Sequence, residues 1–112
     1  MKPMFVYILT NSQKTVLYTG VTNDLAQRLV EHYMDRGLKK TFAGRYYCYY
    51  LVHFEEYNIP VDAIAREKEI KDWRRSRKEE LINSANKNWR FMNNDILDWP
   101  PRVNDLYHRG RI

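Results

Sequence analysis

A chain of 112 residues is long enough for one domain with a modest core, and its 44% hydrophobic and 14% aromatic content exclude a disordered polymer. One cysteine, Cys48, excludes an internal disulfide and a multi-cysteine zinc site, and no apolar run approaches the roughly 20 residues that span a bilayer. The net charge of +5 favours a polyanion partner, nucleic acid before membrane. We therefore expect a cytoplasmic protein with no membrane partner.

Two short apolar and β-branched runs, residues 4–9 and 16–22, predict a pair of strands. The polar, turn-forming segment between them favours a hairpin. Gly20 interrupts the second run, and its missing side chain lets another backbone or a ligand come close. Tyr7 and Tyr18 place one phenol on each strand. They are either ordinary strand tyrosines or the start of a site that handles water and a phosphate.

A helix, a loop and a strand are predicted next. Residues 22–24 supply N-cap side chains for a helix over residues 25–36, and Gly37 suits its end. Residues 38–45 are predicted to form a loop. The aromatic run at residues 46–55 predicts a third strand.

Two further helices are predicted in the second half of the chain. Pro60 suits the first turn of a helix that continues to residue 73 or 74. Ser76 and Glu79 match a capping box, which predicts a helix over residues 77–85.

The last stretch, residues 86–112, is polar yet carries Trp89, Phe91, Trp99 and Tyr107. So many large aromatic residues are unusual in a solvated tail. We predict a domain over residues 1–85 and a C-terminal extension packed on it, with Trp89 and Trp99 as anchors. The alternative is an extension that docks a partner subunit or lies over a DNA groove.

One charged residue stands on an otherwise apolar helix face, where Glu67 lies between Ala63 and Ile70 on a stripe that also includes Ile64. A carboxylate facing a core is costly unless it is paired or binds a metal ion. A structural salt bridge, for example with Arg28, and a divalent cation are both open interpretations.

On the first helix, Arg28 and His32 are one turn apart beside an apolar stripe. An ordinary buried histidine and a snorkelling arginine explain them as well as a site does. In the functional interpretation, Glu67 holds a hard divalent cation and Arg28 stabilises the charge that develops on a phosphate. A tyrosine then takes the proton from the attacking water.

The triplets Phe-Val-Tyr at 5–7 and Tyr-Thr-Gly at 18–20 resemble the two halves of the GIY-YIG motif. Residues 18–25, then Arg28 and His32, and the run 65–71 around Glu67 extend the resemblance over roughly residues 4–82. Phe5 stands at the first glycine of the motif and Thr19 at the isoleucine of its second half. The chain is similar to small free-standing bacterial members and to the nuclease half of the excision-repair C subunit.

The resemblance implies an α+β fold, with a small three-stranded antiparallel sheet flanked by helices. It also implies a metal-dependent endonuclease that hydrolyses DNA in repair or processing, with RNA left open as a partner. Its active-site residues are then Tyr7, Tyr18, Arg28, His32 and Glu67, with Glu67 holding Mg²⁺ or Mn²⁺. Tyr7 is the favoured base and Tyr18 binds the phosphate or the water, with His32 as an alternative proton carrier.

Basic residues near these elements predict nucleic-acid contacts, with a solvated helix junction as the alternative for residues 74–78. Two other functions stay open: a non-catalytic nucleic-acid-binding module, which would also use Tyr46 and Tyr47 for stacking, and a protein-interaction module with a decayed site. The basic residues predicted to bind nucleic acid are Lys39, Lys40, Arg45, Arg74, Arg75 and Arg77.

Overall fold

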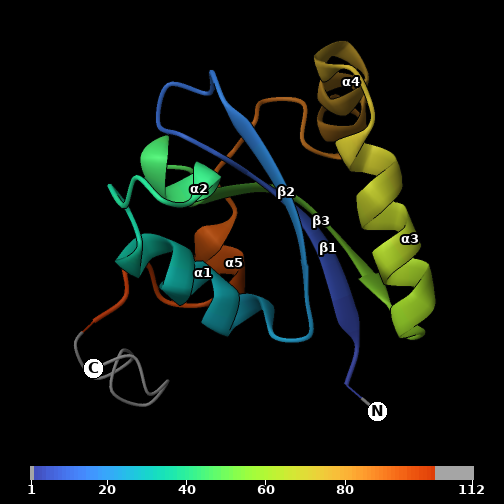
Figure 1. The fold of residues 1–112 in the computed structure, drawn as a ribbon, viewed down its shortest axis with the longest axis horizontal. Coiled ribbons are helices and arrows are strands. Elements are labelled where there is room, and N and C mark those ends of the chain that lie inside the picture. The colour runs from blue at the N-terminus through green and yellow to red at the C-terminus, as the bar shows by residue number, and fades with distance from the viewer. Residues whose placement is uncertain (1, 103–112) are drawn as a thin grey trace.

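The protein is built around a three-stranded antiparallel sheet with helices on both of its faces (Figure 1). The computed structural model describes residues 2–102, and it confirms the predicted α+β class. Within these residues, no helix is both long and apolar enough to cross a membrane. In chain order the elements are β1 (Met4–Thr10), β2 (Leu17–Thr22), α1 (Leu25–Met34), α2 (Phe42–Arg45), β3 (Tyr50–Tyr57), α3 (Pro60–Lys71), α4 (Arg75–Ala85) and α5 (Asn93–Ile96).

The predicted hairpin forms the first half of the sheet, whose strand order is β2-β1-β3. In the β1–β2 register, Tyr7 lies opposite Gly20 and Leu9 lies opposite Tyr18. Directly opposite residues share one face of a sheet, so both phenols start from the same face. The β1–β3 register shifts between Ile8 and Leu9, which leaves Val52 as an extra residue in β3.

Each face of the sheet has its own hydrophobic core. The alternation of side chains along β1 sends Tyr7 toward α1 and its neighbour Val6 toward α3. The buried core on the α1 side consists of Tyr7, Leu9, Leu25, Leu29, Ala43, Cys48 and Leu51. The buried core on the α3 side consists of Val6, Ile8, Val52, Ala63, Ile70 and Ile82.

Helix α1 begins as predicted, because the side chain of Asp24 accepts a hydrogen bond from the Gln27 backbone N–H at 3.0 Å. Its buried face carries Leu25, Leu29 and His32. The helix ends at Met34, two residues before the predicted end.

Three further predictions are wrong for local reasons. The third strand begins at Tyr50, because residues 42–45 form α2 and Tyr47 takes a left-handed backbone conformation with φ of 57°. The fourth helix begins at Arg75, so Ser76 lies inside it and makes no capping box. Ile64 is exposed, which removes it from the apolar stripe predicted on α3.

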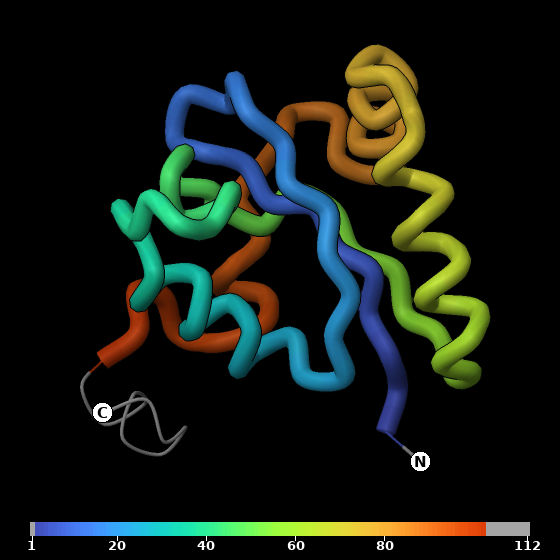
Figure 2. The backbone as a smooth tube through the Cα atoms, in the orientation of Figure 1, coloured from blue at the N-terminus to red at the C-terminus, as the bar shows by residue number. Residues whose placement is uncertain are grey.

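Residues 86–102 of the extension pack along β3, the edge strand opposite β2. The Met92 N–H donates to the Leu51 carbonyl at 2.7 Å, and the Asn93 side chain accepts from the Leu51 N–H at 2.8 Å. Trp89 contacts the α3-side core and Trp99 contacts the α1-side core. Figure 2 traces this segment from α4, behind the sheet, to α5 beside α1. Tyr107 lies outside the described residues.

Candidate active site

Tyr7 lies directly over Gly20. A methyl group at position 20 would overlap the phenol oxygen of Tyr7, so the glycine is required by a side chain rather than by a ligand or another backbone. Tyr7 is fully buried, and its ring stands beside Tyr18 with centroids 6.3 Å apart. The β1–β2 register therefore brings the two halves of the sequence motif into contact.

The phenol oxygen of Tyr7 joins two residues of α1. Arg28 Nε lies 3.3 Å from it and His32 Nε2 lies 2.9 Å from it. A guanidinium can only donate, so the Tyr7 oxygen accepts from Arg28. We assign His32 the neutral tautomer whose proton is on Nδ1, so that the Tyr7 hydroxyl donates its own proton to Nε2. The structure thus brings three of the predicted site residues into one hydrogen-bonded cluster.

The electrostatics of this cluster favour neutral Tyr7 and neutral His32. Burial raises the pKa of Tyr7 above the ordinary value for tyrosine, and the neighbouring Tyr18 adds to that shift. Burial also lowers the pKa of His32 to about 4, and the positive charge of Arg28 acts in the same direction. Near neutral pH the imidazole is therefore uncharged, and in the assigned tautomer Nε2 accepts the Tyr7 proton.

Tyr18 is half-buried and faces a cavity of about 130 Å³. Arg28 and His32 line the same cavity, together with Phe42 of α2. The Tyr18 ring lies 5.2 Å from the His32 ring, centroid to centroid. Of the two phenols, that of Tyr18 is therefore the better placed to meet a molecule that enters from solvent.

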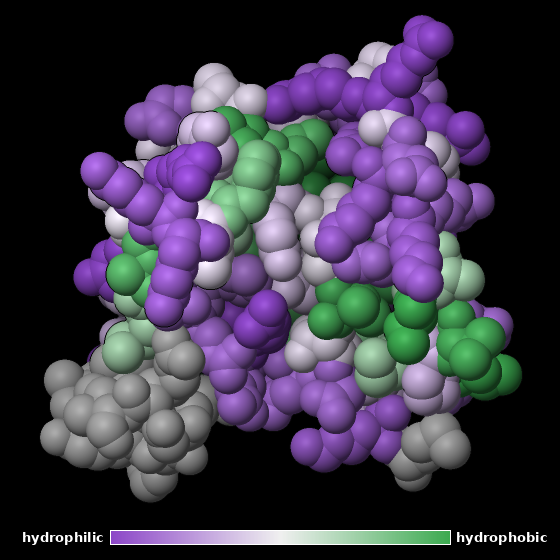
Figure 3. Space-filling view, in the orientation of Figure 1, coloured by the Kyte–Doolittle hydropathy of each residue, from purple (hydrophilic) through white to green (hydrophobic). Residues whose placement is uncertain are grey.

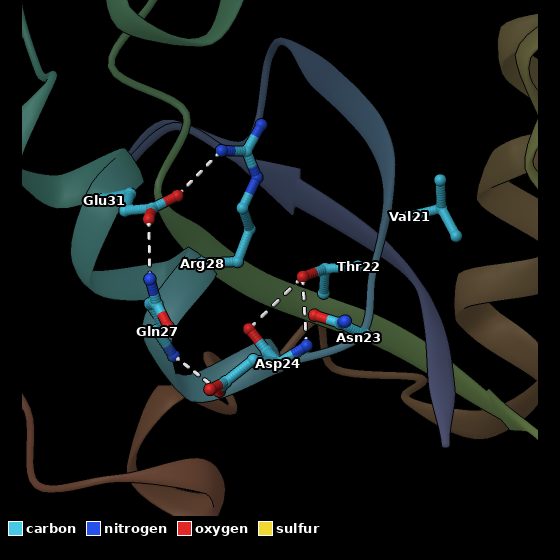
Figure 4. A pocket seen from close by; sticks show the side chains of 7 residues that line it. All are labelled: Val21, Thr22, Asn23, Asp24, Gln27, Arg28 and Glu31. Carbon is cyan, nitrogen blue, oxygen red and sulfur yellow. Dashed lines mark hydrogen bonds and ion pairs between the residues drawn. The ribbon is translucent and has the colours of Figure 1, made fainter. Parts of the chain in front are cut away.

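A larger cavity of about 350 Å³ lies where β2 runs into α1 (Figure 4). Its walls include Asp24 and Gln27, and on the α1 side Arg28 Nη1 pairs with Glu31 Oε1 at 2.8 Å. Gln27 Nε2 donates to the other oxygen of Glu31 at 3.1 Å. Arg28 is thus held from two sides, by Tyr7 and by Glu31. Sequence reasoning missed Glu31, although its spacing of three residues from Arg28 on a helix is a local signal for a pair.

Glu67 lies on α3, the helix that covers the face of the sheet opposite to α1. Its side chain is 12% exposed and pairs with Lys71 Nζ at 2.8 Å. Arg28 pairs with Glu31 instead, so the predicted example of a structural Arg28–Glu67 bridge is wrong. The placement of Glu67 in one cleft with Tyr7 and Arg28 stays a prediction.

Helix geometry shows which way Glu67 turns. Its neighbour Arg66 reaches β3, where Nε contacts Glu55 at 2.9 Å. Successive helical residues differ by about 100°, so Glu67 lies on the flank of α3 toward β2. Figure 1 shows β2 between α1 and α3, and Val21 of β2 packs against the α3-side core. β2 is therefore the strand that separates Glu67 from the Tyr7 cluster.

The donor chemistry of Glu67 fits a hard divalent cation. Among residues 2–102 there is no group of three or more histidine, cysteine, aspartate or glutamate side chains that could hold a metal ion. A largely buried carboxylate with a single ammonium partner fits Mg²⁺, which binds through one or two carboxylates and keeps several waters. Glu67 is thus the residue that would hold Mg²⁺ or Mn²⁺, with waters and substrate oxygens.

The predicted basic residues fall into two groups. Lys39, Lys40 and Arg45 stand exposed on the α1–α2 side, where Arg45 donates to the Lys39 carbonyl at 2.8 Å. Arg74, Arg75 and Arg77 lie at the α3–α4 junction. Figure 3 shows hydrophilic side chains on both flanks of a paler central strip.

Two of the junction arginines have contacts within the fold. Arg75 donates to the backbone carbonyls of Lys14 and Thr15 in the hairpin loop and also pairs with Glu79. The Arg77 guanidinium lies 4.2 Å from the centre of the Trp73 ring. These contacts give both side chains a structural role, and their contact with nucleic acid stays a prediction.

The match to a known family identifies the class of protein. The GIY-YIG catalytic domain matches residues 3–80, so the chain belongs to the GIY-YIG family, which is a family of nucleases that act on DNA and generally depend on divalent metal ions.

The individual relatives are small proteins of similar length. A UPF0213 protein of Haloquadratum walsbyi is 42% identical over 81 residues, which cover 72% of this chain and 88% of the relative. A UPF0213 protein of Natronomonas pharaonis is 40% identical over 78 residues, covering 70% and 88%. The solution NMR structure of a UPF0213 protein from Bacillus halodurans matches with a TM-score of 0.51 and 29% identity, covering 86% of this chain and 97% of that one. The predicted resemblance to small free-standing members is confirmed.

Proposed function

We propose that the protein is a divalent-metal-dependent endonuclease that hydrolyses DNA phosphodiester bonds, with a cytoplasmic role in DNA repair or processing. The observation that carries the proposal is the convergence of Tyr18, Arg28 and His32 on one cavity, beside the buried Tyr7. We propose residues 1–85 as the catalytic domain and residues 86–112 as its extension.

Arg28 binds the phosphate in this mechanism. Its guanidinium is oriented by the Tyr7 oxygen and by Glu31, so it meets the developing charge without having to reorganise. The His32 imidazole fixes the Tyr7 proton and completes this support. Tyr7 and His32 therefore act as positioning residues for Arg28.

Tyr18 is the residue that takes the proton from the attacking water. We assign this role to Tyr18 rather than to Tyr7, because Tyr7 is fully buried and burial holds its phenol neutral. The Tyr18 oxygen first releases its own proton to solvent and then takes a proton from the water. The water oxygen bonds to phosphorus, the bond from phosphorus to the leaving oxygen breaks, and the leaving oxygen takes a proton from solvent. A divalent cation bound at Glu67 would supply a Lewis acid for the phosphate oxygens.

Substitution of Glu67 tests the proposal. Glu67→Gln keeps the size of the side chain and removes its charge, so we expect cleavage of plasmid DNA at limiting Mg²⁺ to fall by about 100-fold or more. Glu69→Gln is the matched control, since Glu69 lies on the same helix and pairs with Arg66 on its exposed side. Cleavage by Glu67→Gln at the wild-type rate would rule out the metal role.

A non-catalytic nucleic-acid-binding module is the second candidate, and the exposed Lys39, Lys40, Phe42 and Tyr46 favour it. The two candidates differ in a single assay. DNA binding without cleavage at any concentration of Mg²⁺ or Mn²⁺ would select the binding module, and loss of both activities would select a protein-interaction role.

A further inference from the structure

Large apolar side chains stand exposed on the segment that joins α1 to β3. Phe42 is 51% exposed and Tyr46 is 42% exposed, with Leu38 and Tyr47 near them in sequence. Such a cluster of exposed apolar residues marks a surface that binds something. We call Phe42 and Tyr46 the aromatic platform.

The aromatic platform is continuous with the candidate active site. The Phe42 ring stacks on the Tyr18 ring, with centroids 6.4 Å apart and planes 25° apart, and the Tyr46 ring lies 4.9 Å from Phe42. Phe42 and Tyr18 also line the same 130 Å³ cavity as Arg28. A row of rings thus runs from the proposed phosphate-binding arginine to the exposed surface.

The segment that carries the platform is held by its own hydrogen bonds. The Thr41 hydroxyl accepts from the Gly44 N–H at 3.1 Å, and the Gly44 carbonyl accepts from the Gly37 N–H at 2.9 Å. A side chain at Gly44 would overlap the carbonyl oxygens of Asp35 and Leu38. The rings are therefore presented by an ordered backbone, which lowers the entropic cost of binding.

The surroundings of the platform are basic. Lys39 and Lys40 stand exposed immediately before it, and Arg45 lies between its two rings in the sequence. Exposed aromatic rings beside cationic side chains are the chemistry by which proteins bind single-stranded nucleic acid, with bases stacked on rings and phosphates on cations. In a duplex the faces of the bases are stacked on one another and are closed to a side chain.

We infer that the aromatic platform stacks unpaired bases next to the scissile phosphate, so that the preferred substrate is single-stranded DNA or a single-stranded segment of a branched duplex. This inference rests on the proposed nuclease function and specifies its substrate. The strand passes with one phosphate at Arg28 and the adjoining bases on Phe42 and Tyr46.

Binding without cleavage tests the inference. A fluorescent oligonucleotide is titrated in EDTA, either single-stranded or annealed to its complement. We expect the wild-type protein to bind the single strand about tenfold more tightly, and Phe42→Ala and Tyr46→Ala each to weaken that binding about tenfold while leaving duplex binding nearly unchanged. Val61→Ala is the control, because Val61 is an apolar residue on α3 with 72% exposure.

A stacking readout comes from 2-aminopurine placed in the single strand, whose fluorescence we expect to be quenched by the wild-type protein and not by Phe42→Ala. Equal affinity for the single strand and the duplex would overturn the inference, and so would equal weakening of both by Phe42→Ala. Variants that change neither would assign the surface to a protein partner. A matched RNA strand that binds more tightly would overturn the choice of DNA.

These measurements separate the inference from the nuclease proposal. If the wild-type protein binds single strands through the platform but cleaves none of them with Mg²⁺ or Mn²⁺, the stacking site stands and the nuclease proposal fails. If it cleaves duplex and single strands at equal rates and Phe42→Ala changes neither, the nuclease proposal stands and the inference fails.

Discussion

Two polar clusters of similar composition and different character lie on the two faces of the sheet, one toward α1 and one toward α3. On the β2 side, Tyr7 of the central strand β1 lies over Gly20 of β2 and contacts a histidine and an arginine of α1. On the β3 side, Glu55 accepts hydrogen bonds from Tyr57 and His53 of its own strand and from Arg66 of α3. Each cluster therefore combines a tyrosine, a histidine and an arginine, but they differ in what stands at the centre.

The central group of each cluster determines whether its hydrogen bonds and its charge are satisfied within the fold. In the β3 cluster both oxygens of Glu55 accept hydrogen bonds, and the charge of Arg66 balances that of the carboxylate. In the β2 cluster the centre is a neutral phenol, so the positive charge of Arg28 faces two cavities with Glu31 at its side. A cationic group directed at a cavity, rather than the residue types alone, is what distinguishes a binding centre from a structural network.

The two edge strands of the sheet, β3 and β2, also differ in how their backbones are covered. Asn86 of the extension donates to the Val52 carbonyl of β3, and Asn93 donates to the carbonyl of Tyr49, the residue before β3, so the extension covers this edge. β2 is the other edge strand and lies between α1 and α3, facing the viewer in Figure 1. We interpret β3 as the structural side and β2 as the functional side of the sheet.

Removing one phenol oxygen on each side of the sheet is expected to give the largest difference in DNA cleavage between two variants. Tyr18→Phe keeps the ring and removes the proposed base, so we expect kcat/KM for DNA cleavage to fall about 100- to 10,000-fold. Tyr57→Phe removes an oxygen from the closed cluster on β3, and we expect it to cleave at the wild-type rate. Equal losses in the two variants would mean that β2 is not the functional side.

The hairpin and α1 were predictable because their signals are local. Turn-forming residues separate the two strands, and Asp24 caps the helix three residues before Gln27. The start of β3 was not predictable in this way, because the aromatic residues at positions 46–49 favour a strand while the left-handed conformation of Tyr47 interrupts it.

The candidate site was predictable only in part, since its central contact joins Tyr7 to His32, 25 residues away. Spacing on α1 singled out Arg28 and His32. The paired strands singled out the two tyrosines, and the motif resemblance then assigned them to the site. The burial that shifts the proposed base from Tyr7 to Tyr18 depends on the α1-side core. That core is formed by side chains from several elements, so no local pattern reports it.

Removing the segment that covers the β3 edge is expected to lower the stability of the protein rather than its rate of DNA cleavage. Truncation after Ala85 removes the hydrogen bonds of Asn93 and the packing of Trp99, and we expect the free energy of unfolding to fall by at least about 3 kcal/mol. The single substitution Asn93→Ala removes only the hydrogen bonds of that side chain, and we expect it to lower the free energy of unfolding by about 2 kcal/mol. Asn88→Ala is the control, because Asn88 is exposed. Urea unfolding measures all three, and a truncated protein that unfolds like the full chain but cleaves faster would show instead that the extension limits access to the DNA.

Lowering the pH is expected to remove the stability contributed by His32 and by Glu55 over different pH ranges. The His32 pKa is about 4 in the folded protein and 6.5 in an ordinary histidine, so the unfolded chain takes up the proton first as the pH falls. Stability from this residue is therefore present above pH 6.5 and is lost toward pH 4, by at most about 3 kcal/mol. Burial alone would raise the pKa of Glu55, but hydrogen bonds from His53, Arg66 and Tyr57 outweigh it and lower the pKa to about 2. Its contribution is present above pH 4.5 and is lost below that value.

The two windows can be separated by one variant on each side. We expect His32→Gln to flatten the dependence of unfolding free energy on pH between 6.5 and 4, and Glu55→Gln to flatten it only below 4.5. Urea unfolding at a series of pH values measures both slopes. Because the folded protein keeps His32 neutral until the pH approaches 4, we expect cleavage per folded molecule to hold through the upper window and to decline only near pH 4. A wild-type slope in His32→Gln between pH 6.5 and 4 would show that the imidazole is not held neutral by its burial, and the hydrogen bond from Tyr7 would then need the opposite direction.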